Sequence, residues 1–229
     1  MSRSLETLAR FPPFAGLAES EIAVLDAQCL WRRANAGVWV LDYGEGGTDV
    51  FFVARGALRV TVLSAEREVI LRDLAEGDFF GELAAIDGQP RSAGILAINE
   101  SVIGRMPGPR FLEAIYRHPS LCKAVLMQLA AEVRKLANQV NEFSTLSVNR
   151  RLHAELLRLA KPKPNDHSQL VISPPPTHAE LAARVATRRE AVNRELKALE
   201  RAGLVERRRG ALALPDPERF RRMLLEREV

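Results

Sequence analysis

Short apolar runs separated by turn residues dominate the chain between residues 38 and 106. Glycines punctuate these runs, for example Gly56, Gly77 and Gly88. Runs of this length between glycine turns are typical of antiparallel strands. We therefore predict an antiparallel roll or barrel with strands at 38–41, 50–53, 58–63, 69–74, 95–98 and 102–106.

The first 30 residues have a helical pattern instead. Ile22, Leu25 and then Cys29 or Leu30 recur at steps of three to five, while Pro12-Pro13 interrupts the segment. This spacing predicts short helices that cap the sheet.

A longer helical pattern starts at Pro119 and runs to about Leu146. Its apolar residues follow one another at steps of three and four, and a seam of mixed leucine and β-branched residues favours a parallel two-stranded coiled coil. The alternative is a single amphipathic helix packed on its own roll. The predicted dimer seam is Leu126, Leu129, Val133, Leu136, Val140 and Phe143.

Beyond a hinge at 146–148, we predict a helix at 151–160, an exposed loop at 161–166 and a strand at 169–172. Two candidate helix starts then lie ten residues apart. Thr177 with Glu180, and Thr187 with Glu190, each fit the capping box. A short helix, a tight turn near Ala186 and a second helix give the layout of a helix-turn-helix.

The second of these helices has an inward stripe of Val192, Leu196 and Leu199 and a basic outward face. After it, residues 204–214 turn at Gly210 and predict a two-stranded wing. The run Arg207-Arg208-Arg209 suits backbone phosphates. A solvated basic face is the ordinary alternative to DNA binding.

Charge divides the chain unevenly. Residues 1–145 hold 15 Lys and Arg against 18 Asp and Glu, a net charge of −3, whereas residues 146–229 hold 18 against 11, a net charge of +7. The basic half is therefore expected to meet a polyanion. Cys29 and Cys122 lie far apart with no CxxC spacing, so neither a disulfide framework nor a metal site is predicted.

One short stretch combines the chemistry of an anion site. Phe80-Gly81-Glu82-Leu83 is followed, after seven residues, by Arg91-Ser92-Ala93. A strand at 78–80 and a short helix at 81–86 would present free backbone N–H groups to a phosphate. Arg91 adds charge-assisted donors worth about 1.5–3 kcal/mol, and Glu82, which can only accept, matches a sugar hydroxyl. The alternative is an Arg91–Glu82 salt bridge on the surface, with no ligand.

This stretch resembles the phosphate-binding cassette of cyclic-nucleotide-binding domains. From about residue 17 to 215 the chain resembles the cAMP receptor protein and FNR (Crp/Fnr) family of bacterial transcription regulators. The resemblance implies an α+β protein in three parts: an N-terminal cyclic-nucleotide-binding β-roll (a double-stranded antiparallel jelly roll, 1–118), a dimerisation helix with its hinge (119–147) and a winged helix-turn-helix DNA-binding domain (148–229).

The resemblance also implies a cyclic nucleotide, cAMP or cGMP, as the allosteric ligand. Where cAMP-responsive members carry a Thr-Ser pair on the dimer helix to hold the adenine, this chain has Leu136-Ala137, so the choice of base stays open. The implied ligand-binding residues are Gly81, Glu82, Leu83, Arg91, Ser92, Ala93, Leu136 and Ala137.

For DNA, the resemblance matches Arg189, Glu190 and Arg194 to the family's three base-reading positions. It implies a two-fold symmetric operator with TGTGA-like half-sites. The full predicted DNA-binding set is Thr177, His178, Arg188, Arg189, Glu190, Asn193, Arg194, Lys197 and Arg208.

A homodimer, and an RNA polymerase contact through 161–167, are implied in the same way. With no signal-peptide pattern and no apolar run near the roughly 18 residues that cross a bilayer, we expect a cytoplasmic protein. One alternative keeps DNA binding without nucleotide control, or with another small anion. An enzyme acting on a nucleotide is the other, but the sequence holds no nucleophile and base pair, metal-ligand cluster or Walker motif.

Overall fold

The structure is a computed structural model that describes residues 6–64, 67–163 and 166–225. The chain divides into two compact units, residues 1–135 and 136–229, and the division falls within one long helix. Each unit has its own hydrophobic core. Among the described residues, no helix is long and apolar enough to cross a membrane.

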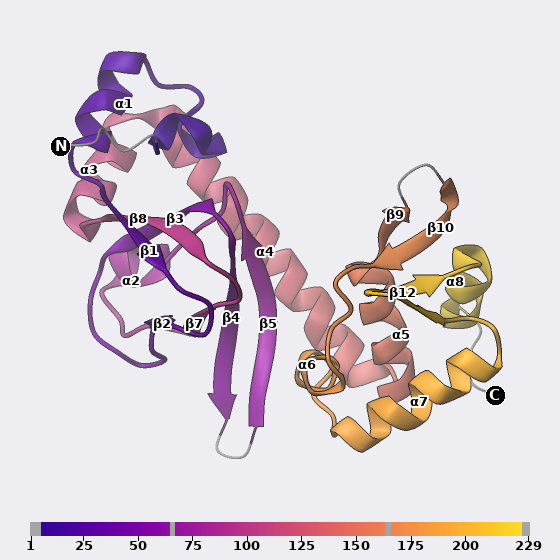
Figure 1. The fold of residues 1–229 in the computed structure, drawn as a ribbon. Helices are drawn as coiled ribbons and strands as arrows, with labels where there is room; N and C mark the ends of the chain where they lie inside the picture. The colour runs from indigo at the N-terminus through magenta and orange to yellow at the C-terminus, as the bar shows by residue number, and fades with distance from the viewer. Residues whose placement is uncertain (1–5, 65–66, 164–165, 226–229) are drawn as a thin grey trace. The chain divides into compact units, whose positions relative to one another are not determined.

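Two four-stranded antiparallel sheets form a roll in the first unit (Figure 1). Their strand orders are β1-β8-β3-β6 and β2-β7-β4-β5. All the strands predicted between residues 38 and 106 are confirmed. The strands are β1 (Leu30–Ala34), β2 (Trp39–Leu41), β3 (Val50–Arg55), β4 (Ala57–Ser64), β5 (Arg67–Ala75), β6 (Phe79–Phe80), β7 (Gly94–Ala97) and β8 (Ser101–Met106).

Strand β1 differs from the prediction, which placed Leu30 on a helical stripe. Helix α1 covers Glu19–Asp26, and Leu30 instead begins β1, where it pairs with Arg105 of β8. The reason is that β1 is an edge strand whose side chains are mostly exposed. Such a strand lacks the alternation of apolar and polar residues that reveals a strand in a sequence.

The helical segments at the start of the chain cap the roll, as predicted. Phe11 and Phe14 pack edge-on against Phe52 of β3, with ring centroids 5.4 and 5.5 Å away. Phe79 and Phe111 complete this aromatic core. The helical segments of this unit, besides α1, are η1 (Leu8–Arg10), η2 (Pro12–Phe14), α2 (Glu82–Asp87) and α3 (Gly108–Arg117).

Helix α4 (Pro119–Thr145) follows, with bounds close to those predicted. Leu121 and Val125 are buried in the aromatic core of the first unit. After Thr145 the helix stops, and α5 begins at Val148, which confirms a break at the predicted hinge.

In the second unit, helices surround a four-stranded sheet of order β11-β12-β10-β9 (Figure 1). Val192, Leu196 and Leu199 are buried in its core, and the wing turns at Gly210, so both predictions are confirmed. The elements are α5 (Val148–Leu159), β9 (Lys161–Lys163), β10 (Asp166–Ile172), α6 (His178–Arg184), α7 (Arg189–Arg201), β11 (Glu206–Arg208), β12 (Ala211–Leu214) and α8 (Pro217–Leu225).

The predicted exposed loop at 161–166 is wrong for its described part. Lys161–Lys163 forms strand β9, which pairs with β10, and β10 starts at Asp166, before the predicted strand. Residues 164–165 lie outside the described residues. The prolines in this segment suggested a loop, but β9 is an edge strand, where proline is tolerated.

The two predicted helix starts have different outcomes. The capping box at Thr177 is confirmed: its Oγ1 accepts from the Glu180 N–H at 3.1 Å, and Glu180 Oε2 accepts from the Thr177 N–H at 2.7 Å. The box at Thr187 is wrong, because the Thr187 N–H donates to the Ala182 carbonyl at 2.9 Å and Arg188 becomes the N-cap of α7. Between the helices, Ala186 takes a positive φ of 50°, in keeping with the predicted tight turn.

Candidate functional site

The first part of the predicted cassette, residues 80–83, forms the turn from β6 into α2, and its second part, residues 91–93, lies between α2 and β7. Gly81 is the N-cap of α2 with φ of 85°, a conformation that favours glycine. A Cβ at this position would lie 2.8 Å from the Asp49 carbonyl oxygen and 2.9 Å from Arg91 Nη1. The backbone of Gly81 is therefore packed directly against the predicted anion-binding arginine.

Arg91 is buried, with 5% of the residue exposed. Its Nη1 donates to the Gly81 carbonyl at 3.0 Å, and its backbone N–H donates to the Glu45 carbonyl at 2.9 Å. Its Nε is buried without a hydrogen-bond partner. Within the described residues no ion pair joins Arg91 to Glu82, so the alternative of a surface salt bridge between them is wrong.

Two further groups define the surroundings of Arg91. The Arg91 guanidinium lies 5.7 Å from the centroid of the Phe51 ring, and that of Arg32 lies 5.8 Å from the same centroid. Arg105 Nε donates to Asp49 Oδ2 at 2.6 Å, so one oxygen of this nearby carboxylate is already paired. Burial lowers the pKa of Arg91, against the opposing charges of Glu45, Asp49 and Glu82.

Glu82 is buried as well, with 8% exposed, at the first position of α2. Burial is the largest cause of its raised pKa, which its own backbone hydrogen bond and the charges of Arg72 and Arg91 partly offset. A carboxylate kept out of water in this way needs a donor from a ligand or a proton. The charge of Arg91 lowers the pKa of Glu82, and the charge of Glu82 raises the pKa of Arg91, each against the larger effect of burial.

The other predicted ligand residues are placed less closely. Leu83 is 45% exposed, Ser92 is exposed, and Ala93 packs against the core of the roll. Leu136 and Ala137 are exposed on α4 in the second unit, so their role at the base stays a prediction. Sequence reasoning missed Arg32, Phe51 and Asp49, because nothing in the sequence links 32 or 49–51 to residue 91.

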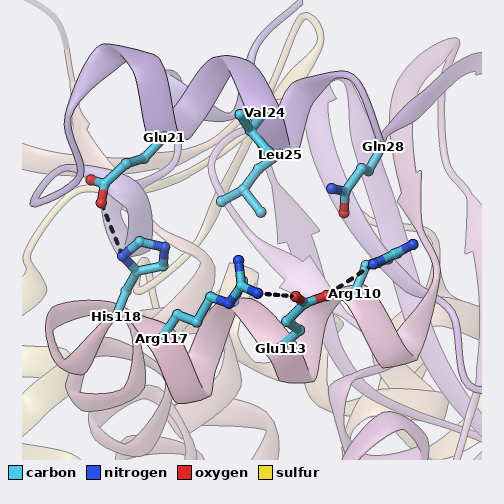
Figure 2. A pocket seen from close by; sticks show the side chains of 9 residues that line it. Glu21, Val24, Leu25, Gln28, Arg110, Glu113, Arg117 and His118 are labelled. Carbon is cyan, nitrogen blue, oxygen red and sulfur yellow. Dashed lines mark hydrogen bonds and ion pairs between the residues drawn. The ribbon is translucent and has the colours of Figure 1, made fainter.

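A separate cavity of about 490 Å³ lies between α1 and α3 (Figure 2). Glu113 pairs there with Arg110 at 3.0 Å and Arg117 at 2.8 Å, and Glu21 pairs with His118 at 3.5 Å. Its lining residues do not include any residue of the cassette. Because its charged groups are already paired with one another, we assign it no ligand.

The predicted DNA face lies on α6, α7 and the wing. Arg189, Glu190, Arg194 and Lys197 are exposed on α7, while Asn193 is partly buried. Arg188 and Thr177 are the exposed N-caps of α7 and α6. An exposed row of this kind at the start of the second helix is where base edges are read in helix-turn-helix proteins.

The wing contacts the first of these helices through His178. Its Nε2 accepts from Arg207 Nη2 at 3.2 Å, and Arg207 also donates to Glu200 at 2.5 Å. Burial and then the charge of Arg207 lower the pKa of His178. Arg208 donates to Gln169 at 2.9 Å and to Glu206 at 2.8 Å, so its guanidinium is held at the exposed edge of the wing.

The predicted dimer seam is largely open to solvent in the single chain. Leu126, Val133, Leu136 and Val140 are 60%, 65%, 42% and 65% exposed, respectively. Leu129 packs partly on the core of the first unit, which is the behaviour expected of the alternative, a helix lying on its own roll. Phe143 is half-buried, with the Arg151 guanidinium 5.0 Å from the centroid of its ring. The other four seam residues form an apolar stripe that this chain leaves uncovered.

The fold combines a β-roll that carries a glycine and arginine cassette, a long helix and a winged helix-turn-helix. This combination defines a DNA-binding transcription regulator with a sensor domain of the cyclic-nucleotide-binding type. Comparison with known proteins agrees. The model of the cyclic nucleotide-binding domain matches residues 31–118, and that of the Crp-like helix-turn-helix domain matches residues 150–223. The chain belongs to the Crp/Fnr family of transcription regulators.

The relatives include the cAMP-activated global transcriptional regulator CRP of Pasteurella multocida, 33% identical over 172 residues, which are 72% of this chain and 80% of that protein. Vfr of Pseudomonas aeruginosa, also named a cAMP-activated global regulator, is 30% identical over 78% of this chain and 86% of its own length. A solved CooA mutant from Carboxydothermus hydrogenoformans shares the fold, with a TM-score of 0.78, 18% identity and coverage of 96% of this chain and 98% of its own. The relatives are regulators, which confirms that the chain is not an enzyme.

Proposed function

We propose that this protein is a homodimeric transcription regulator whose affinity for a two-fold symmetric DNA operator is controlled by a cyclic nucleotide, cAMP or cGMP, bound in the N-terminal roll. The observation that carries the proposal is the buried Arg91 guanidinium beside Gly81. An arginine kept from water with an unpartnered N–H is costly unless a ligand pairs with it.

A cyclic phosphate supplies what this site lacks. Its oxygens accept from the Arg91 guanidinium and from backbone N–H groups at the start of α2. Glu82 accepts from a ribose hydroxyl, which is a neutral donor to a buried acceptor. Leu83, Ser92 and Ala93 complete the cassette around them. One small molecule thereby satisfies both buried charges.

The relatives support a nucleotide and leave its identity open. CRP and Vfr are named as cAMP-activated. The global regulator CLP of Xanthomonas campestris, whose title calls it c-di-GMP responsive, shares the fold at a TM-score of 0.70 and 23% identity. In this chain Leu136-Ala137 offers no side-chain hydrogen bond to a base. A test therefore has to include all three nucleotides.

Homodimer formation and DNA reading rest on two surfaces. The apolar stripe on α4 provides a two-fold interface, in which each copy covers the other's exposed leucines and valines. Paired recognition helices would then enter major grooves one helical turn apart, with Arg189, Glu190 and Arg194 at the base edges of TGTGA-like half-sites. The β9–β10 hairpin, part of the predicted RNA polymerase contact at 161–167, stays a proposal by resemblance.

Isothermal titration calorimetry of the full-length protein tests the ligand. We expect cAMP or cGMP to bind the wild type and Arg91→Ala to lose at least about tenfold in affinity, as removal of a charge-assisted contact implies. Arg59→Ala is the matched control, since the Arg59 side chain is 12% exposed and paired with Asp73 on the same roll. Three results would contradict the proposal: no heat of binding with either cAMP or cGMP, binding of c-di-GMP alone, or equal losses of affinity in both variants.

A further inference from the structure

Arg72 occupies an unusual position for an arginine, on the inward face of strand β5. It pairs across the ladder with Val60, and it shares a face with Leu74, which is fully buried. Cross-strand partners point to the same side of a sheet, so Arg72 and Val60 both face the core of the roll. The Arg72 side chain is 17% exposed. A charge placed there needs a partner or a ligand.

The partner of Arg72 is on the long helix. Arg72 Nε lies 3.2 Å from Glu132 Oε1, and the Glu132 side chain is 30% exposed. This ion pair joins one nitrogen of the guanidinium to one oxygen of the carboxylate. The ion pair itself therefore leaves the two Nη groups of Arg72 and the second oxygen of Glu132 for other hydrogen bonds. Glu132 also lies one helical turn before Leu136, the position that the family resemblance assigns to the base.

The ion pair lies near the cassette in one sheet: Val60, the ladder partner of Arg72, pairs on its other edge with Ile95, four residues after Arg91. The charges of Arg72 and Glu132 both act on the buried Glu82, which is the predicted ribose contact. Glu82 in turn acts on Arg91, the predicted phosphate contact. The proposed phosphate and sugar contacts use Arg91 and Glu82, which leaves Arg72 and Glu132 without an assigned role.

We propose that Arg72 and Glu132 form the base-recognition subsite of the proposed ligand site, an inference that rests on the cyclic nucleotide proposed above. Arginine is a donor only, and an ionised glutamate is an acceptor only. The edge of a purine carries an N7 acceptor beside either the amino donor of adenine or the carbonyl acceptor of guanine. Together the two side chains can satisfy either edge, whereas Leu136-Ala137 cannot.

The two purines use the pair differently. Guanine offers two acceptors, N7 and O6, to the fork of Arg72, so that residue carries most of its recognition. Adenine offers N7 to Arg72 and its amino group to Glu132, so it depends on the carboxylate. Loss of each side chain should therefore change the preference between the nucleotides in opposite directions. A pair that only braces the roll against α4 would weaken both ligands equally.

Calorimetry of the full-length protein with cAMP and cGMP tests this. We expect Arg72→Met to weaken cGMP binding about tenfold more than cAMP binding, and Glu132→Leu to weaken cAMP binding about tenfold more than cGMP binding. A tenfold change is the lower end of the effect expected from the loss of one charge-assisted hydrogen bond. Asp73→Asn is the matched control: Asp73 pairs with Arg59 at 2.9 Å on the same strands but the opposite face. It should leave the affinity ratio unchanged within about twofold.

If Arg72→Met fails to fold, Arg72→Lys replaces it, because lysine keeps the charge opposite Glu132 and loses only the fork; cGMP should again weaken more than cAMP. An affinity ratio that stays constant in the variants would overturn this inference alone. A wild-type protein that binds neither nucleotide would overturn the proposed ligand, and the inference with it.

Discussion

Gly81 gives the sharpest test of how the cassette is built. It is the N-cap of α2, and Gly88 is the C-cap of the same helix, with φ angles of 85° and 70°. The two glycines share the left-handed conformation but differ in their surroundings. A Cβ at Gly81 would approach the Asp49 carbonyl oxygen to 2.8 Å, whereas a Cβ at Gly88 would meet no atom within 4 Å.

The two alanine variants therefore separate conformational strain from close packing. A left-handed backbone conformation costs an L-residue about 1–2 kcal/mol in the folded state. Alanine also restricts the unfolded chain, which offsets this cost by about 0.4–1 kcal/mol. Gly88→Ala should thus lose about 1 kcal/mol of the free energy of unfolding. Gly81→Ala adds an overpacking cost of about 1–3 kcal/mol, since the nearest obstacle is a backbone oxygen that no rotamer change can move. Its total loss should be about 2–4 kcal/mol.

Urea unfolding followed by tryptophan fluorescence measures both losses. The chain has two tryptophans, Trp31 and Trp39, and both lie in the first unit, on β1 and β2. The signal therefore reports on the roll. We also expect Gly81→Ala to lose nucleotide binding, because the Arg91 guanidinium must shift, and Gly88→Ala to retain it. Equal destabilisation by the two substitutions would refute this explanation of the cassette.

Three other outcomes follow from the structure. Val133→Glu should convert the proposed dimer to a monomer in sedimentation velocity at micromolar concentration, while Asn138→Glu, on the same helix but off the stripe, should not. Arg194→Ala should cost about 1–3 kcal/mol on the operator and relax sequence preference, whereas Arg208→Ala should weaken all DNA alike and lower the salt slope by about 1; identical behaviour of the two would contradict these roles. Glu82 has a pKa raised by burial, so the folded state binds its proton more tightly and loses stability as pH rises. Glu82→Gln should then have a larger free energy of unfolding than wild type near neutral pH, and this difference should shrink as pH falls. A difference that does not change with pH would contradict the prediction.

Much of the architecture could be predicted from local patterns. The strands of the roll, the inward stripe of α7 and the turn at Ala186 each follow from residues that are neighbours in the sequence. The cassette could be predicted for the same reason, since Gly81 and Arg91 are only ten residues apart.

What the sequence concealed depends on contacts between distant segments. Arg32 reaches the Phe51 ring only because β1 and β3 flank β8 in one sheet. Strand β1 itself has no burial pattern to reveal it. The capping box at Thr187 failed because its N–H donates to Ala182, a turn contact that the motif cannot anticipate. Likewise, the pairing of Arg72 with Glu132 joins residues that are 60 positions apart.

The central claim is that nucleotide binding in the roll is coupled to operator binding. Fluorescence anisotropy of a labelled duplex with two TGTGA-like half-sites, titrated with protein at fixed salt, measures this directly. We expect saturating cAMP or cGMP to tighten the Kd by about 5–150-fold, a coupling of about 1–3 kcal/mol, and Arg91→Ala to abolish the change while keeping the unliganded affinity. Operator affinity that is the same with and without nucleotide would contradict the account.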